Sequence, residues 1–160
     1  MKPTRIIWHH SADPSTARQF DKINVAHRNR TFPQSEMGYY VGYHWLIEPD
    51  GTLRQARPET EIGAHDTGEN LNSIGVCIAG DFTARTPSEA QRATAAKLIG
   101  DIRKRWNIPL TRIEPHRWDD ATACPGDLLA DNFLINEYLK REGSLFFQLF
   151  QFIGKKFNLL

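Results

Sequence analysis

Residues 73–80 have the sequence SIGVCIAG, which is a continuous apolar run. A short run of this kind is typical of a strand that is buried on both faces, as in the middle of a parallel sheet. Residues 5–8, RIIW, form a second apolar run and predict another buried strand, which ends at His9 and His10. Two buried strands far apart in the chain indicate a central sheet.

A β-hairpin is predicted between these two strands. Its arms cover about residues 41–48 and 52–57, and the residues Pro49, Asp50 and Gly51 separate them. Proline followed by aspartate and glycine is a strong turn signal. We therefore expect one antiparallel pair of strands in the sheet.

Three helices are predicted, and their approximate ranges are 16–30, 89–106 and 127–140. We expect Ser15 or Thr16 to cap the first helix and Ser88 the second, because their hydroxyls accept a free backbone N–H at a helix start. Helices and strands alternate along the chain. The predicted fold class is α/β, with a central mixed β-sheet flanked by helices.

A separate segment follows this domain, which we place at residues 1–142. Residues 143–160 predict an amphipathic helix, because apolar side chains recur there at helical spacing. These side chains are Phe146, Leu149, Phe150, Ile153, Phe157 and Leu160. Residues 144–160 either dock onto the domain or lie on a membrane surface, where Lys155 and Lys156 would meet anionic lipid.

The composition excludes several classes of protein. The chain has 160 residues, the size of one domain, and its 20 Lys and Arg nearly balance 19 Asp and Glu, for a net charge of +1. This balance argues against nucleic acid as a partner. Two cysteines are too few for a disulfide-linked secreted scaffold, and four Trp, four Tyr and nine Phe exclude a disordered chain.

From the apolar content of the sequence, we expect neither a signal peptide nor a membrane span. The RIIW run before the two histidines is shorter than the roughly 7–15 apolar residues of a signal peptide. No segment approaches the roughly 20 apolar residues that cross a membrane. We therefore expect the protein to be cytoplasmic on synthesis.

Three residues can form a metal site if the fold brings them together. His9, His116 and Cys124 offer two imidazoles and one thiolate, which suit a tetrahedral zinc site with a fourth position left for water. Zinc in such a site lowers the pKa of water toward ~7. Neighbouring residues on a strand point to opposite faces, so only one of His9 and His10 can reach a given metal, and composition does not choose between them.

Four segments carry a resemblance to a known family. They are IIWHHSA (6–12), GYHWLIEPDGTL (42–53), GAHDTGENLNSIGVCIAGDF (63–82) and PHRWDDATACPGD (115–127). In this order they resemble the zinc-dependent type-2 N-acetylmuramoyl-L-alanine amidases, which include phage endolysins and are related to the peptidoglycan recognition proteins. The resemblance covers about residues 5–130.

The resemblance implies a metal-dependent hydrolase. It places the zinc ligands at His9, His116 and Cys124. The implied reaction cleaves the amide between N-acetylmuramic acid and L-alanine in peptidoglycan, as in an endolysin that reaches the cell wall after its release. We expect the protein to act as a monomer.

The resemblance also implies roles for three further residues. Tyr43 matches a tyrosine that lies beside the metal and assists catalysis, and His65 matches a histidine expected near the substrate groove. Thr122 stands where some phage relatives have a catalytic lysine, so it is either an oxyanion donor or a residue that caps the loop. The other histidines are expected to be structural, and Cys77 is expected to be buried in the core.

Two alternatives to the amidase remain. One is a peptidoglycan-binding module without activity, as in the non-catalytic recognition proteins, which typically lack the cysteine ligand that Cys124 matches. The other is a cytoplasmic amidase of wall recycling, whose close members tend to have aspartate at that position.

Overall fold

The computed structural model describes residues 1–143. Within these residues, one sheet contains five strands in the order β3-β2-β4-β1-β5. The strands are β1 (Arg5–His10), β2 (Trp45–Ile47), β3 (Leu53–Gln55), β4 (Ser73–Ile78) and β5 (Ile113–Pro115). The predicted amphipathic helix and its membrane contact fall on residues 144–160, which lie outside the described residues.

The sheet is mixed, as predicted. Strand β1 pairs in parallel with both β4 and β5, and β2 pairs in parallel with β4. Strands β2 and β3 form the predicted antiparallel hairpin, although both are shorter than the expected arms. The two apolar runs of the sequence are therefore neighbours in the middle of the sheet, where every residue of β1 and β4 is buried.

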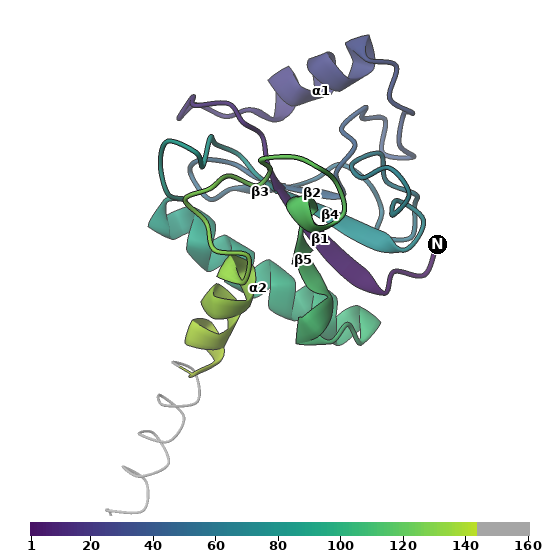
Figure 1. Ribbon diagram of the computed structural model, residues 1–160. Coiled ribbons are helices and arrows are strands. Elements are labelled where there is room, and N and C mark those ends of the chain that lie inside the picture. The colour runs from purple at the N-terminus through teal and green to yellow at the C-terminus, as the bar shows by residue number, and fades with distance from the viewer. Residues whose placement is uncertain (144–160) are drawn as a thin grey trace, which may run out of the picture.

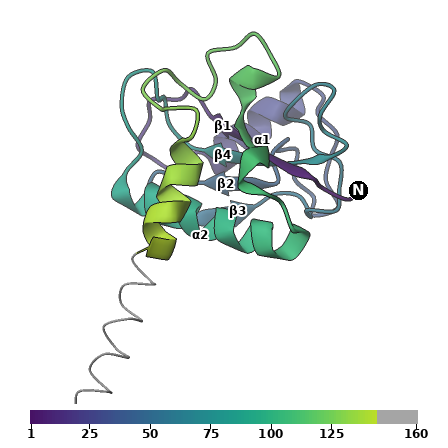
Figure 2. The same cartoon turned by 60° about the horizontal axis from the view of Figure 1, so that its bottom comes forward.

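Helices cover both faces of the sheet (Figure 1). Helix α1 (Phe20–Asn29) lies on one face, where Phe20 packs in a cluster with Leu46 and Cys77. Helix α2 (Glu89–Trp106) lies on the other face, and a helix over residues 133–143 crosses it (Figure 2). Two single-turn 3-10 helices flank β5, namely η1 (Leu110–Arg112) and η2 (His116–Trp118). Cys77 is fully buried, as expected.

The start of helix α2 agrees with the sequence. Ser88 is its N-cap and accepts the backbone N–H of Gln91 (3.2 Å), while the Gln91 side chain accepts the backbone N–H of Ser88 (3.1 Å). This reciprocal capping box depends only on local residues. Local sequence therefore predicted it.

Helix α1 begins at Phe20, so the predicted cap at Ser15 or Thr16 is wrong. Its N-cap is Gln19, whose side chain makes no cap hydrogen bond. Instead, the carboxylate of Glu48 accepts the backbone N–H groups of Gln19 (2.7 Å) and Phe20 (3.1 Å). Because Glu48 follows strand β2, this cap depends on the tertiary structure.

The last described helix also begins later than predicted, at residue 133 instead of Asp127. The backbone N–H of Leu128 donates to the carbonyl of Phe82 (3.0 Å), and Leu129 is buried. These contacts hold residues 127–132 in turns against a distant loop before the helix can start.

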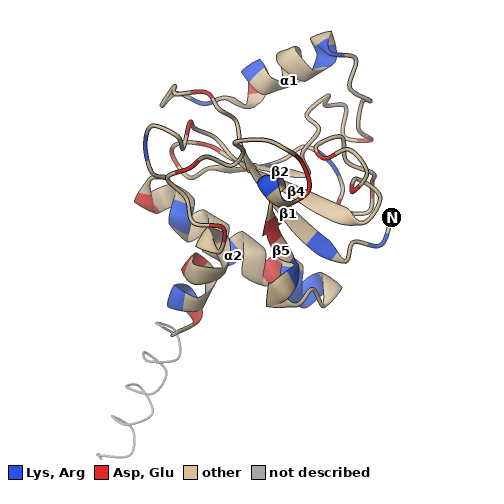
Figure 3. Ribbon diagram, in the orientation of Figure 1, with Lys and Arg blue, Asp and Glu red and all other residues tan. Residues whose placement is uncertain are grey.

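Charges of both signs are interspersed over the described residues (Figure 3), in agreement with the small net charge. In this same part of the chain, no helix combines the length and the apolar character needed to cross a lipid bilayer.

His44 is a buried structural histidine. Its Nδ1 accepts the backbone N–H of Gly75 (2.9 Å), and its Nε2 lies 3.0 Å from the carbonyl oxygen of Glu61. Because Nδ1 is an acceptor, the proton is on Nε2, which donates to Glu61. Burial is the main reason that the pKa of His44 is lowered to about 4.

Protonation of His44 is expected to destabilise the fold in mild acid. The pKa of this ring is about 4 when folded and about 6.5 when unfolded, so the unfolded chain binds more protons between these values. The free energy of unfolding should therefore fall by roughly 2–3 kcal/mol between about pH 7 and pH 4.5 from this residue. Urea unfolding at the two pH values measures the change.

The matched variant is His44→Asn, because the asparagine oxygen can accept the Gly75 N–H but does not titrate in this range. It should be less stable at neutral pH and should lose less stability on acidification. Equal pH dependence in the two proteins would contradict the role of His44.

Candidate metal centre

The predicted ligands meet at one edge of the sheet. His9 is near the carboxyl end of β1, and His116 directly follows β5, which is parallel to β1. Cys124 lies on the loop after η2. One donor atom from each of the three side chains lies within 4.8 Å of the other two. The fold therefore brings together two imidazoles and a thiol from distant parts of the chain.

The structure places His9 in this cluster and turns His10 away from it. His9 pairs in register with Cys77, on the face of the sheet covered by α1. The Nδ1 of His10 accepts the backbone N–H of Phe82 (3.2 Å). The backbone N–H of His10 also donates to the sulfur of Cys124 (3.4 Å). His10 therefore supports the site through its main chain.

The three donors suit a zinc ion. Nδ1 of His9 lies 3.7 Å from Sγ of Cys124. Nitrogen and sulfur ligands of a tetrahedral zinc ion are about 3.6 Å apart, given the usual bond lengths. Nδ1 of His116 is buried and has no hydrogen-bond partner among the described residues. A buried nitrogen is costly in that state, and binding a metal would satisfy it.

Burial controls the protonation of these ligands. Burial, and then the neighbouring rings of His65 and His116, keep the pKa of His9 well below its usual value, so His9 is neutral and ready to bind a metal. Burial raises the pKa of Cys124 to about 11, although the N–H of His10 opposes the shift. Without metal the thiol is protonated, so binding of a divalent cation must release its proton.

Tyr43 lies beside the cluster. Its ring is 5.1 Å from the ring of His9 and 5.6 Å from that of His27, measured between centroids. Burial, and then the thiols of Cys77 and Cys124, raise the pKa of Tyr43 well above its usual value. The hydroxyl therefore keeps its proton and can act as a hydrogen-bond donor.

Thr122 caps the loop that carries Cys124. Its hydroxyl oxygen accepts the backbone N–H of Cys124 (3.1 Å). This bond uses a lone pair and leaves the hydroxyl proton free to be donated. The capping role is therefore present, and the oxyanion role stays a prediction.

His65 lies directly behind His9. Its Nδ1 is 3.1 Å from Nε2 of His9, and its Nε2 is 3.4 Å from the hydroxyl of Ser73. Two glycines make room for the ring, because a Cβ would lie 2.5 Å from Cδ2 of His65 at Gly63 and 2.4 Å at Gly75. His65 thus contacts the predicted ligand His9, and its expected contact with substrate stays a prediction.

Two carboxylates lie near His116 that the sequence did not predict as part of the site. Asp120 Oδ2 lies 3.2 Å and Asp66 Oδ2 lies 4.0 Å from Nε2 of His116. Burial raises the pKa of Asp66 to about 6. The only local signal is position, since Asp66 directly follows His65 and Asp120 is four residues after His116.

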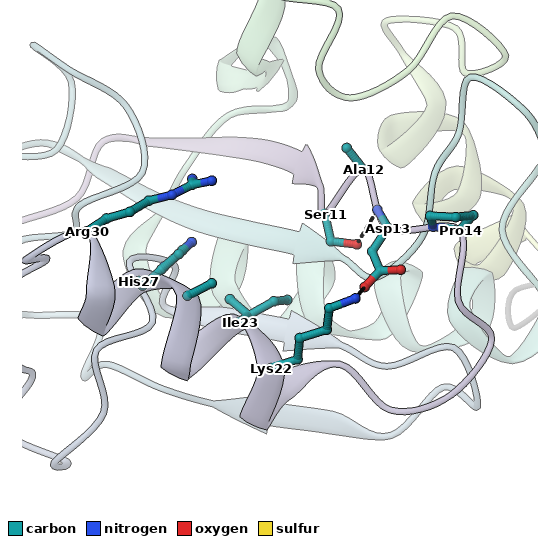
Figure 4. Close-up of a pocket in the computed structure, with 9 residues that line it drawn as sticks. Ser11, Ala12, Asp13, Pro14, Lys22, Ile23, His27 and Arg30 are labelled. Atoms are coloured by element: carbon teal, nitrogen blue, oxygen red, sulfur yellow. Dashed lines mark hydrogen bonds and ion pairs between the residues drawn. The ribbon is translucent and has the colours of Figure 1, made fainter.

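A cavity of about 350 Å³ lies between the loop that follows β1 and helix α1. Figure 4 shows His27 of α1 and Arg30, which directly follows α1, pointing toward the cavity, with the ion pair of Lys22 and Asp13 beside them. The ring of His27 also contacts Tyr43. The residues that line it are Ser11, Ala12, Asp13, Pro14, Lys22, Ile23, Ala26, His27 and Arg30. Tyr43 therefore lies between His27, which lines the cavity, and the predicted metal ligand His9.

Known proteins resemble this chain in sequence and structure. A family model described as N-acetylmuramoyl-L-alanine amidase matches residues 1–127. The chain is 30% identical over 120 residues to peptidoglycan-recognition protein SC2 of Drosophila melanogaster. This alignment covers 74% of this chain and 65% of that protein. It is 42% identical over 90 residues to the endolysin of Enterobacteria phage K11, covering 53% and 58% of the two chains. It therefore spans less than two thirds of these curated relatives.

A solved structure confirms the fold. The N-acetylmuramoyl-L-alanine amidase LysC from Clostridium intestinale URNW has a TM-score of 0.72 and 28% sequence identity, and the match covers 89% of this chain and 87% of that chain. The residues of this chain that match the family model, 1–127, include His9, His116 and Cys124. By these matches, the chain belongs to the N-acetylmuramoyl-L-alanine amidase family.

Proposed function

We propose that this protein is a zinc-dependent amidase that cleaves the bond between N-acetylmuramic acid and L-alanine in peptidoglycan. The observation that carries the proposal is the convergence of the donor atoms of His9, His116 and Cys124. Membership of the amidase family supports the choice of bond.

The proposed reaction needs an activated water and a stabilised oxyanion, because an amide carbonyl is a poor electrophile. Zinc held by His9, His116 and Cys124 would supply a water of lowered pKa and polarise the carbonyl. In the proposed reaction, the protonated hydroxyl of Tyr43 would donate a hydrogen bond to the negative oxygen that develops. The hydroxyl of Thr122 can donate a second one.

The cavity beside α1 supports a peptide substrate. The Nδ1 of His27 accepts the backbone N–H of Gly42 (3.0 Å), so its proton is on Nε2. Arg30 also lines the cavity, and burial and then the positive charge of Arg30 lower the pKa of His27 to about 4. A hydrogen-bond donor and a positive charge suit the carboxylates of a stem peptide.

Removal of metal is expected to abolish hydrolysis of purified cell wall. Dialysis against a chelator should stop the release of new L-alanine amino termini, and added Zn²⁺ should restore it. New amino termini and new reducing sugars are quantified in parallel by chemical labelling. Release of reducing sugars would contradict the proposal and indicate a glycosidase, and activity that survives complete metal removal would contradict the zinc dependence.

We further propose that the protein acts as an endolysin, made in the cytoplasm and released to the wall. The similarity to the endolysin of phage K11 supports this role. Contact of residues 144–160 with membrane lipid belongs to the same proposal. A binding module without activity is disfavoured because Cys124 completes the donor set.

A further inference from the structure

Two carboxylates lie near one nitrogen of the His116 ring. Nδ1 of His116 is the buried nitrogen without a partner, and Nε2 lies 3.2 Å from Asp120 and 4.0 Å from Asp66. An imidazole that donates from one nitrogen presents a lone pair at the other. The carboxylates therefore favour the tautomer whose Nδ1 can bind a metal.

Asp66 is a buried carboxylate and not a surface residue. Its side chain is fully buried, and both carboxylate oxygens lack a hydrogen-bond partner among the described residues. Its backbone N–H and that of His65 donate to the side-chain oxygen of Asn70 (3.1 and 2.8 Å), which fixes the loop. A buried carboxylate without partners lowers stability, so this arrangement has a cost that a role at His116 explains.

The adjacent residues His65 and Asp66 each lie near one of the two imidazoles of the cluster. His65 lies behind His9, with Nδ1 and Nε2 3.1 Å apart, and Asp66 lies toward Nε2 of His116. The loop that contains them therefore brings one polar side chain near each ring.

Asp120 is held by the turn that also carries His116. Its backbone N–H donates to the carbonyl of His116 (3.2 Å), and the neighbouring Asp119 is paired with the buried Arg5 (2.5 Å). Arg5 lies on β1, so the turn is tied to the strand that carries His9. The carboxylate of Asp120 itself is half exposed, so substitution there should not disturb the core.

We propose that Asp120 and Asp66 are positioning residues that hold His116 with Nδ1 directed at the metal position. Asp120 accepts the Nε2 proton directly, and the charge of Asp66 supports the same orientation from the buried side. The inference rests on the proposed function, because it assumes that the cluster binds zinc. Carboxylates behind a ligand histidine typically contribute tenfold to hundredfold in metal affinity.

The test is a zinc titration of metal-free protein in competition with a chromophoric chelator. Asp120→Ala and Asp66→Asn should weaken Zn²⁺ binding by about tenfold to hundredfold, and Asp120→Glu should recover part of the loss. Asp127→Ala is the matched control, because this exposed aspartate pairs with Arg117 (3.3 Å) instead of His116. Its Zn²⁺ affinity should remain within about threefold of the wild type.

Thermal unfolding of the metal-free proteins separates positioning from a structural role. Asp66→Asn should be as stable as the wild type or more stable, because it removes a buried charge. Weaker zinc binding without loss of stability supports the inference. Zinc affinities equal to that of Asp127→Ala overturn it, as does a loss of stability that accounts for the weaker binding. A wild-type protein that binds no Zn²⁺ overturns the proposed function as well.

Discussion

Replacing Cys124 with alanine is expected to remove zinc and to lower the rate of wall hydrolysis by at least about 10³-fold. The thiolate is the one anionic donor of the three, and its loss leaves two neutral imidazoles, of His9 and His116. The fold should persist, because Cys124 lies on a loop and its sulfur makes only long contacts, with the N–H of His10 (3.4 Å), Nδ1 of His9 (3.7 Å) and the carbonyl of His10 (4.0 Å). Metal analysis after dialysis and the wall assay measure the two effects.

The chain offers a matched control in its second cysteine. Cys77→Ala makes the same chemical change in the core, on β4, where it should cost about 1 kcal/mol of stability. This variant should keep about one zinc ion per chain, which is the quantity to compare with Cys124→Ala. Zinc retained at full occupancy by Cys124→Ala would contradict its assignment as a ligand.

Sequence predicts the centre of this fold better than its boundaries. The runs at 5–8 and 73–80 form adjacent buried strands because apolar burial is a property of the residues themselves. The Ser88 cap was predicted because its partner is three residues away. The start of α1 was not, because its cap is Glu48, which only the folded chain brings near.

The same distinction holds for the site. His9, His116 and Cys124 stand in recognisable motifs, and the parallel pairing of β1 with β5 brings the two histidines together. The approach of Asp66 to His116 depends on the path of a loop, and no spacing in the sequence encodes it.

Tyr43→Phe is expected to lower kcat/KM by about 10²–10³-fold, because it removes one donor to the developing oxyanion. The phenyl ring keeps the contacts of Tyr43 with His9 and His27, at centroid distances of 5.1 and 5.6 Å. Zinc affinity and thermal stability should therefore stay close to those of the wild type. Kinetics on a soluble muropeptide and a zinc titration measure these quantities.

The control for this variant is Tyr39→Phe, since Tyr39 packs against Phe20 (4.9 Å) in the same apolar cluster and is no neighbour of His9 in the ring contacts of the described residues. It loses the same hydroxyl and should keep its activity.

The raised pKa of Tyr43 means that the hydroxyl remains a donor throughout the neutral range, so the defect of Tyr43→Phe should not change between about pH 6 and pH 8. A defect that appears only at one end of that range would indicate that Tyr43 acts as a base, and an equal loss in zinc affinity would indicate that it holds the metal site.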